Sequence, residues 1–230
     1  MLIYPTIKMS PLLGLQGSGG GLDYLAPKVS GPEIGEFYEG GYFAGYISQS
    51  NNGVATHGLI VSPKASGSYS DGYRQFKTSN SNDGYGNSVF DGAGNTASQA
   101  ASGDHPAASY CAGLTINTYS DWYLPARYEL YIAYYNLKPT TENNDTGHGV
   151  NSYAVPPLSS NYTNSPRNPD QTTVSVFQDG SSEFFRATEY WSSTQHTSST
   201  AWQVRFNDGT PSNVGKDSDL RVRAFRKFAV

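Results

Sequence analysis

The side chains of this sequence that could bind metals or act as nucleophiles are few and scattered. The 230-residue chain has four histidines and one cysteine, which are His57, His105, His148, His196 and Cys111. None of the histidines has a second histidine or a cysteine at the spacing of a metal site. Cys111 stands in the apolar segment HPAASYCAGL, which favours a buried, inert thiol. A single cysteine also excludes an internal disulfide, so we predict neither a zinc site nor a disulfide framework.

Calcium is the one ion for which the sequence offers a pattern. The segment DGYGN at 83–87 recurs as DGAGN at 91–95, and calcium takes oxygen ligands of this kind. Asp-Gly and Gly-Asn pairs are also typical of turns and helix caps. We favour turns and caps, so no cofactor is predicted, and calcium stays the open alternative.

Motifs of nucleophilic and phosphate chemistry are missing. The sequence has neither Gly-x-Ser-x-Gly nor Gly-x-x-x-x-Gly-Lys. A glycosidase needs only two carboxylates, and a pair such as Asp170 and Glu183 is available, but nothing in the sequence singles it out. We expect a protein that is not an enzyme, with cleavage of a surface polysaccharide as an alternative.

The segment YWSSTQHTSSTAWQVRFNDG, residues 190–209, suggests binding. It places nine small or polar residues, 192–200, between Trp191 and Trp202. Such a mixture is typical of paratopes, where aromatic rings supply rigid contact area and small polar groups supply adaptable hydrogen bonds. Sugars are bound by the same combination. We predict that both indoles are core residues that hold a polar display surface.

Several elements are expected to position this surface. Residues 41–47 and 57–63 are predicted to be strands, and 77–96, rich in Asn, Asp and Gly, an ordered loop. Small residues after position 95 or 96 have helical character. The clearest helix is 125–139, with Pro125 in its first turn and Pro139 at its end. One face of it is apolar: Leu130, Ala133, Tyr134 and Leu137.

The second half of the chain is expected to be mostly loops and strands. Residues 139–171 are polar, and such a long segment is either functional or packed as an excursion. Residues 171–180 suggest a short helix. Trp202, Val204 and Phe206 alternate with polar residues, as in a half-buried strand, before a tight turn at Asp208-Gly209.

The end of the chain is predicted to return as two strands. Pro211 marks the irregular or edge start of the first. The last strand is 220–228, with Arg221 and Arg223 on one face. We expect these arginines to pair with acids such as Asp217 or Asp219, with a phosphate or anionic-sugar contact as the alternative.

The composition is consistent with short strands and ordered turns in an α+β domain. Aromatic residues make up 13% and charged residues 15% of the chain, with 25 Gly and 13 Pro. A net charge of −4 argues against a nucleic-acid partner. No window has transmembrane length, and the start is a poor secretory signal. We predict synthesis in a reducing cytoplasm and no membrane insertion.

Residues 1–37 differ from the rest. They mix leucines with a glycine run and cannot bury a core, so they form either a flexible leader or a strap that docks on a partner. We favour docking, because so many leucines are unusual in a spacer. The predicted organisation is an extended attachment or oligomerisation segment, 1–37, followed by a binding domain, 38–230.

Four blocks resemble the motifs of a bacterial and phage family. They are DWYLPARYEL at 121–130, YWSST at 190–194, AWQVRFNDG at 201–209 and RVRAFR at 221–226. The family includes the C-terminal domains of collagen-like bacterial adhesins and many phage tail-fibre proteins. The resemblance covers about residues 40–227, and GGYFAGYI, DGAGNTASQAA and HPAASYCAGLTINTYSDWYLP extend it towards the phage branch. It implies a C-type-lectin-like α+β domain with short strands, one or two main helices, long ordered loops and paired terminal strands.

Two activities of related proteins are not carried over. The formylglycine-generating enzymes use paired cysteines, whereas Cys111 stands alone. Calcium-dependent lectins of this fold use Glu-Pro-Asn or Gln-Pro-Asp with Trp-Asn-Asp. The segments NPD at 168–170 and FND at 206–208 match these motifs poorly.

The resemblance also implies a ligand surface. In phage tropism determinants of this fold, the ligand is bound by segments shortly before the last strand. Some of the matching residues must be scaffold. Carried onto this sequence, the predicted receptor-binding residues are Gln195, His196, Ser198, Ser199, Gln203, Arg205, Asn207, Asp208, Ser212, Asn213, Lys216 and Asp217.

The resemblance therefore predicts a phage tail-fibre or receptor-binding protein located in the virion tail. It would recognise a bacterial surface glycan or protein, form a homotrimer, and join other tail proteins through residues 1–37. The alternative is a structural virion component, in the baseplate or as a capsid decoration, that makes only protein–protein contacts.

Overall fold

A computed structural model describes residues 31–68, 73–82 and 84–230. Residues 1–30, most of the predicted attachment segment, lie outside these ranges. The compact unit comprises Pro32–Val230, and its first strand, β1 (Phe37–Tyr38), spans the boundary expected at residue 37. This unit is a mixed α+β domain, as predicted, and it has few helices and mostly antiparallel strands. No helix in the described ranges is long and apolar enough to cross a membrane.

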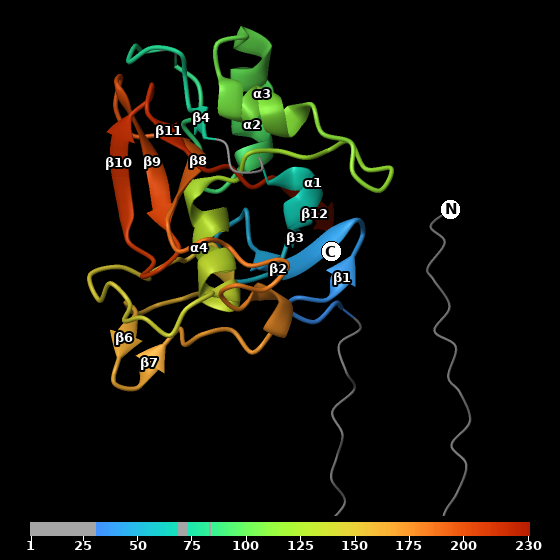
Figure 1. Cartoon of the computed structure of the whole chain (residues 1–230), viewed down its shortest axis with the longest axis vertical. Coiled ribbons are helices and arrows are strands. Elements are labelled where there is room, and N and C mark those ends of the chain that lie inside the picture. The colour runs from blue at the N-terminus through green and yellow to red at the C-terminus, as the bar shows by residue number, and fades with distance from the viewer. Residues whose placement is uncertain (1–30, 69–72, 83) are drawn as a thin grey trace, which may run out of the picture. The chain divides into compact units, whose positions relative to one another are not determined.

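The first sheet brings together the two ends of the compact unit. Its order is β1-β2-β3-β12, where β2 is Gly41–Ile47, β3 is His57–Val61 and β12 is Phe225–Ala229 (Figure 1). The short strand β5 (Ala154–Val155) also pairs with β2. The two predicted N-terminal strands are confirmed, and the second ends at Val61. The C-terminal strand pairs with β3 and not with β1.

The last strand is shorter than predicted. Residues 220–228 do not form one strand: β11 (Asp219–Leu220) pairs with β4 (Arg74–Gln75), and β12 starts only at Phe225. Between them, Arg223 is 1% exposed and donates to the carbonyl of Ser62 and the carboxylate of Glu183. A buried guanidinium needs several acceptors, and these lie outside the strand ladder.

The arginines of this segment also have other partners than expected. Arg223 pairs with Glu183, and the neighbouring Arg226 pairs with Glu39 and Asp121. Arg221 lies over the ring of Tyr73 at 4.9 Å. Asp217 accepts a hydrogen bond from Asn80 instead. The prediction that Asp217 or Asp219 serves the arginines is wrong for Arg223, because the chain turns Arg223 into the core.

The second sheet contains the polar stretch of interest. Its order is β10-β9-β8, all antiparallel, with β8 at Glu189–Gln195, β9 at Thr200–Arg205 and β10 at Pro211–Gly215. Pro211 opens the edge strand β10, as predicted, where its missing N–H removes no ladder bond. The β9–β10 turn contains Gly209, whose φ of 77° and N–H bond to the carbonyl of Arg205 close it.

In the part of the domain that the structure describes, four helices and a 3₁₀ turn accompany the strands. They are α1 (Lys64–Gly67), α2 (Gly92–Ser102), α3 (Pro106–Ala112), α4 (Arg127–Leu137) and η1 (Ser175–Phe177). The prediction of α4 is confirmed, although Pro125 precedes the N-cap Ala126 and lies outside the first turn. α2 starts earlier than expected, because the carboxylate of Asp91 caps it by accepting from the N–H of Gly94.

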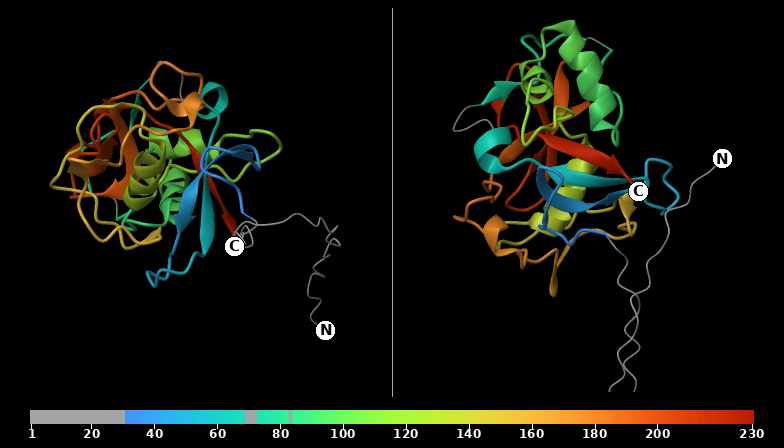
Figure 2. Two further views of the ribbon diagram at one scale, coloured as in Figure 1. Left: turned by 90° about the horizontal axis from the view of Figure 1, so that it is seen from below. Right: turned by 90° about the vertical axis from the view of Figure 1, so that its right-hand side faces the viewer.

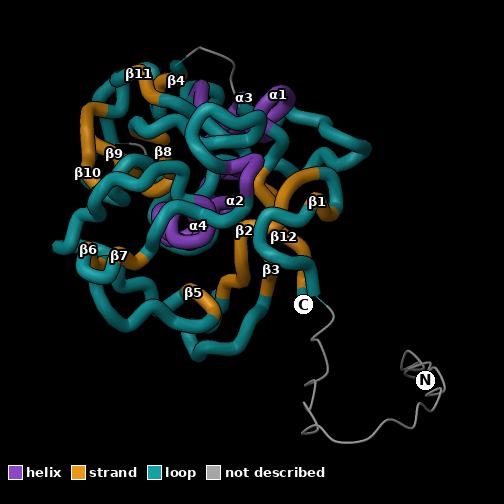
Figure 3. The backbone as a smooth tube through the Cα atoms, turned by 60° about the horizontal axis from the view of Figure 1, so that its bottom comes forward, coloured by secondary structure: helices purple, strands orange, loops and turns teal. Residues whose placement is uncertain are grey.

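The position of α4 between the two sheets organises the core. Figure 1 shows α4 between β8–β10 and the sheet that contains β2, and the right-hand view of Figure 2 shows β12 beside the N-terminal strands. All four residues of its predicted apolar face are buried. Tyr134 meets the Phe206 ring at 5.8 Å, and Ile132 packs close to Gly45 of β2. Figure 3, in which α4 is seen nearly end-on, shows that much of the surrounding chain is loop.

Residues 139–171 are a packed excursion. They contain the two-strand ladder of β6 (Thr163–Asn164) and β7 (Arg167–Asn168). Asn144, 6% exposed, donates to the carbonyls of Thr163 and Pro169 and accepts from the buried ammonium of Lys138. These bonds hold the excursion against the C-terminal end of α4.

The two tryptophans expected in the core have different environments. Trp191 is fully buried, and its indole N–H donates to the carbonyl of Arg74 at 2.8 Å. Trp202 is only partly buried, and the groups over its ring are Arg127 and His196. The core prediction is therefore wrong for Trp202. It lies beside the first residue of α4, where the apolar cover of the helix ends.

Candidate functional site

The predicted receptor-binding residues follow the β8–β9–β10 meander and do not form one compact site. Gln195, His196, Ser198 and Ser199 belong to the β8–β9 turn, whereas Arg205, Asn207 and Asp208 lie at the β9–β10 turn. The six residues of β9 separate these two turns, which is about 20 Å at the rise of a strand. The exposed members of the set are His196, Ser198, Ser212, Asn213 and Asp217.

Lys216 and Gln195 belong to the scaffold of the meander. Lys216 is 0% exposed, and its ammonium donates to the side-chain carbonyl of Gln195 and to the carbonyl of Ser81. Its backbone N–H also bonds to the carbonyl of Ser199. Gln203, 9% exposed, donates to the hydroxyl of Ser212 at 2.6 Å. These bonds fix strand ends and leave the side chains little freedom to meet a ligand.

The β9–β10 turn is tied to the excursion. Arg205 pairs with Asp208 at 3.3 Å, and the amide of Asn207 donates to the carboxylate of Glu142. The backbone N–H of Asp145 donates to the carbonyl of Asp208 at 2.8 Å. This turn therefore serves mainly to join two parts of the fold.

A row of partly exposed aromatic side chains begins at the other turn. His196 meets Trp202 edge-on at 4.5 Å, and the guanidinium of Arg127 lies 4.2 Å from the centre of the Trp202 ring. Arg127 also lies 5.1 Å from the ring of Tyr128. The row continues through stacked pairs, Tyr128 with Tyr153 at 5.5 Å and Tyr153 with Phe90 at 4.6 Å. We call these six residues the aromatic track: Phe90, Tyr153, Tyr128, Arg127, Trp202 and His196.

Backbone bonds around the first turn of α4 position the track. The N–H of Arg127 donates to the hydroxyl of Thr194 at 3.0 Å, and the N–H of Tyr128 donates to the carbonyl of Val89 at 2.9 Å. Asn151 donates to the carbonyl of Tyr128 and accepts from the N–H of Tyr153. The start of α4 thus gathers β8, the loop before α2 and the excursion at one place.

Only His196 of the aromatic track was among the predicted binding residues. Trp202 was assigned to the core, and the other four were not recognised. Phe90 and Tyr153 lie in loops, where no periodicity marks them. The PARYEL block contains Arg127 and Tyr128, but its helical pattern does not reveal which side chains reach the surface.

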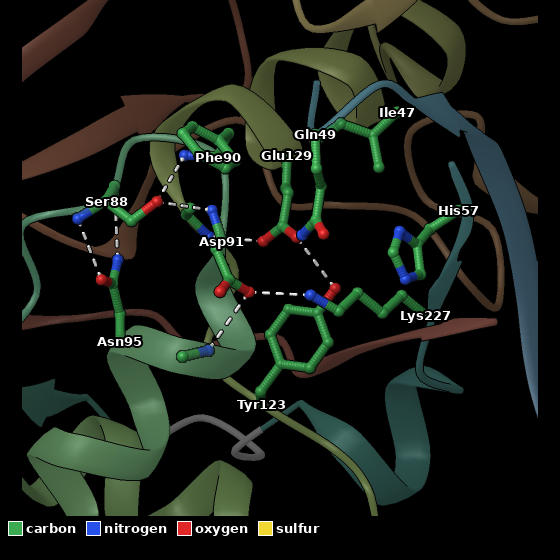
Figure 4. Close-up of polar contacts among 12 residues, drawn as sticks. Ile47, Gln49, His57, Ser88, Phe90, Asp91, Asn95, Tyr123, Glu129 and Lys227 are labelled. Carbon is green, nitrogen blue, oxygen red and sulfur yellow. Dashed lines mark hydrogen bonds and ion pairs between the residues drawn. The ribbon is translucent and has the colours of Figure 1, made fainter. Parts of the chain in front are cut away.

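A second polar cluster lies where α2 and α4 begin (Figure 4). The ammonium of Lys227 donates to the carboxylate of Asp91 at 2.7 Å. In the same cluster, the buried carboxylate of Glu129 accepts from the hydroxyl of Tyr123 and from the N–H of Ala126. This cluster ties both helix N-termini to β12, and helix capping accounts for each carboxylate.

The ionisable groups of this cluster have shifted pKa values. Burial raises the pKa of Glu129 to about 7, against the opposing effect of the Ala126 N–H. Burial would also raise the pKa of Asp91, but hydrogen bonds from Lys227 and Gly94 outweigh it and lower that pKa. Burial and the charge of Lys227 lower the pKa of His57. Glu129 therefore keeps its proton to a higher pH than an exposed glutamate does.

The remaining chemical candidates have structural partners. Asp91 is a helix cap, which confirms the capping interpretation of the DGAGN segment; Asp83 lies outside the described residues. The described ranges hold no group of three His, Cys, Asp or Glu side chains that could bind a metal. Of the carboxylate pair considered for hydrolysis, Asp170 pairs with Arg167 and Glu183 with Arg223. Cys111 is buried, as predicted, and burial raises the pKa of its thiol.

Fold and site together define an antiparallel α+β domain with a polar and aromatic surface at the start of its central helix. Compared with models of protein families and with curated protein sequences, the chain matches none of them.

Proposed function

We propose that this protein is a phage tail-fibre or receptor-binding protein that recognises a bacterial surface glycan or protein. We further propose that its domain is C-type-lectin-like and binds through the aromatic track and the adjoining exposed turn at 196–198. The observation that supports this most directly is the track itself, because five rings and one guanidinium in a row, all at least partly exposed, are unusual on a surface that no ligand covers.

The chemistry of the track suits a glycan. Sugars offer apolar CH surfaces to aromatic rings and hydroxyl groups to amides and hydroxyls. The β8–β9 turn places Thr197 and Ser198, both exposed, beside His196. The hydroxyls of Tyr128 and Tyr153 form no hydrogen bond within the described part of the chain and are not enclosed. Both the β8–β9 turn and the two tyrosine rings therefore present polar groups next to an apolar surface.

The wider assembly is part of the proposal. Residues 1–37 would attach the protein to other tail proteins in the virion, and three copies would present three binding sites. Multivalency would then strengthen weak contacts at single sites.

A structural virion component is the second candidate. In that case the same surface would be covered by a neighbouring virion protein and would not face the host. The aromatic track is compatible with such a contact, since interface cores are rich in Tyr, Trp and Arg.

The test is binding of the purified full-length protein to intact bacteria of the host range. Trp202→Ala and His196→Ala are compared with Val54→Ala, a matched surface change on the β2–β3 connection, where Val54 is 64% exposed. We expect at least a tenfold loss of binding for the first two and none for the third. Circular dichroism checks that every variant is folded.

Other outcomes would point to a different binding site or to a structural role. Equal binding by all variants would move the receptor site away from the track. The next candidate is the excursion at 140–171, which borders a cavity of about 330 Å³. Failure of the unaltered protein to bind any host cell would favour the structural role.

A further inference from the structure

The guanidinium of Arg127 is held among three aromatic rings. Its central carbon lies 4.2 Å from the ring centre of Trp202, 5.1 Å from that of Tyr128 and 5.5 Å from that of Tyr131. Arginine stacks on aromatic faces while its five N–H donors stay in the plane of the group. The rings therefore orient the donors without occupying them.

Arg127, which is partly buried, differs in its partners from the buried arginines Arg223 and Arg226. Arg223 and Arg226 each bind at least one carboxylate. No carboxylate of the described residues pairs with Arg127, although its side chain is only partly exposed. Its Nε–H is enclosed and has no acceptor there. A buried N–H without an acceptor is costly, so its persistence requires an explanation.

The hydroxyl of Tyr131 lies at the same place. Tyr131 is 2% exposed, and its hydroxyl faces the guanidinium of Arg127, whose charge lowers the pKa of the hydroxyl against the larger effect of burial. Burial raises the pKa of this hydroxyl to about 12, so it is a neutral donor at physiological pH. This hydroxyl lies too deep to reach a ligand, so the guanidinium, whose terminal nitrogens are not enclosed, is the donor that an oxyanion can meet.

We propose that Arg127 binds the carboxylate of an acidic sugar, such as a uronic or nonulosonic acid, on the host surface. This inference rests on the proposed receptor-binding function and names its ligand class. A planar carboxylate matches the arginine fork bidentately, and such charge-assisted bonds are among the strong ones in proteins. The sugar ring then lies along the aromatic track.

Because the chain as a whole is negatively charged, it needs a local cationic group such as Arg127 to bind an acidic glycan. At −4 the protein does not attract acidic polymers in general. Recognition of an acidic glycan must therefore come from a built cationic group. Loss of Arg127 alone is expected to abolish it.

Calorimetric titration of the full-length protein tests the proposal. The probes are a panel of oligosaccharides that contain uronic or nonulosonic acids, each beside its methyl ester, in which the same ring lacks the charge. We expect at least one acid to bind at least tenfold more tightly than its ester. Arg127→Gln should remove this preference, and Arg127→Lys, which keeps the charge but loses the fork, should restore only part of it.

Two controls make the test specific. Arg167→Gln removes an arginine on β7, which lies far from the first turn of α4 (Figure 1). This variant should leave the preference for the acid over its ester unchanged. Inorganic phosphate is the competing probe. If phosphate displaces the bound acid only weakly, the carboxylate is the recognised group; if phosphate alone binds at Arg127, the ligand is a phosphorylated glycan and the proposal is overturned.

The inference and the proposed function fail in different ways. If no acid of the panel is preferred over its ester, and Arg127→Gln adsorbs to host cells normally while Trp202→Ala does not, the surface binds a neutral receptor. In that case only the inference is lost. If neither variant affects adsorption, the receptor site lies elsewhere and both are lost.

Discussion

The guanidinium of Arg223 donates to the carboxylate of Glu183 at 3.0 Å, inside the domain, where Arg223 is 1% exposed and Glu183 is 8% exposed. Glu183 also accepts the N–H of Lys64 at 2.7 Å. The pair thus joins the segment before β12 to the start of α1. Replacing one partner would leave the other charge buried.

Glu183→Gln is therefore expected to lower the free energy of unfolding by about 3 kcal/mol or more, because Arg223 loses its counter-charge. The matched control is Asp170→Asn. Asp170 also pairs with an arginine at 3.0 Å, but its side chain is 65% exposed, so its loss should cost less than about 1 kcal/mol. Urea unfolding of both variants measures the difference. Equal losses would show that burial does not decide the strength of these pairs.

The raised pKa of Glu129 predicts that the free energy of unfolding depends on pH. Its folded-state pKa of about 7 lies above the 4.5 that is usual for a free glutamate side chain. The folded state therefore holds the proton more tightly, and the resulting stability is present below about pH 4.5 and is lost as pH rises through 7. Between pH 5 and pH 8 this loss is on the order of 2–3 kcal/mol. Unfolding titrations at both pH values measure it.

Glu129→Gln is the matched control for this pH effect, since an amide keeps the size of the side chain and does not titrate. The variant should lose much of the difference between pH 5 and pH 8. If it keeps the full difference, another group is responsible. Asp91, whose pKa is lowered, acts in the opposite direction, and its contribution is lost only in acid.

Gly209 is expected to be irreplaceable for a packing reason as well as a conformational one. Its φ is 77°, and an added Cβ would lie 2.4 Å from a ring carbon of Tyr134. Gly180 has a similar φ of 83° but nothing within 4 Å of an added Cβ. Gly180→Ala should cost about 1 kcal/mol for backbone strain, and Gly209→Ala about 1–3 kcal/mol more for overpacking. Thermal unfolding of both variants separates the two causes.

Lys216 and Ser198, both predicted to bind the receptor, are expected to behave differently. Lys216→Met leaves acceptors at Gln195 and Ser81 without their donor, so stability should fall by about 1–3 kcal/mol. Ser198→Ala changes an exposed residue and should alter stability by less than about 0.5 kcal/mol. Denaturant unfolding compares them. A neutral Lys216→Met would show that these hydrogen bonds do not stabilise the meander.

The sequence alone predicted those elements whose signals are local. The strand at 41–47, the helix ending before Pro139, the edge position of Pro211 and the turn around Gly209 are all present. Each depends on periodicity or on the backbone preferences of Pro and Gly, which neighbouring residues express by themselves. The short helix at 175–177 and the burial of Trp191 and Cys111 were predicted in the same way.

Elements that depend on distant partners were predicted less well. Residues 220–224 have the alternation of a strand, yet Arg223 leaves it to reach Glu183 and Ser62. α2 starts before the predicted residue because Asp91 caps it. Lys227, which is distant in the sequence, holds the Asp91 carboxylate in place. A local sequence pattern does not show that a distant residue will bind a side chain and so override the local preference for a strand or a loop.

The sequence by itself determined the class of the domain, the spacing of its turns and the low charge of its polar aromatic stretch, because these properties follow from residue types and their nearest neighbours. Only the tertiary structure decided which of these side chains meet. It placed Trp202 beside Arg127 and Tyr153 beside Phe90, and it enclosed Lys216, although the stretch around each is polar. Side chains from separate elements come together only when α4 packs between the two sheets, and the candidate site exists only there.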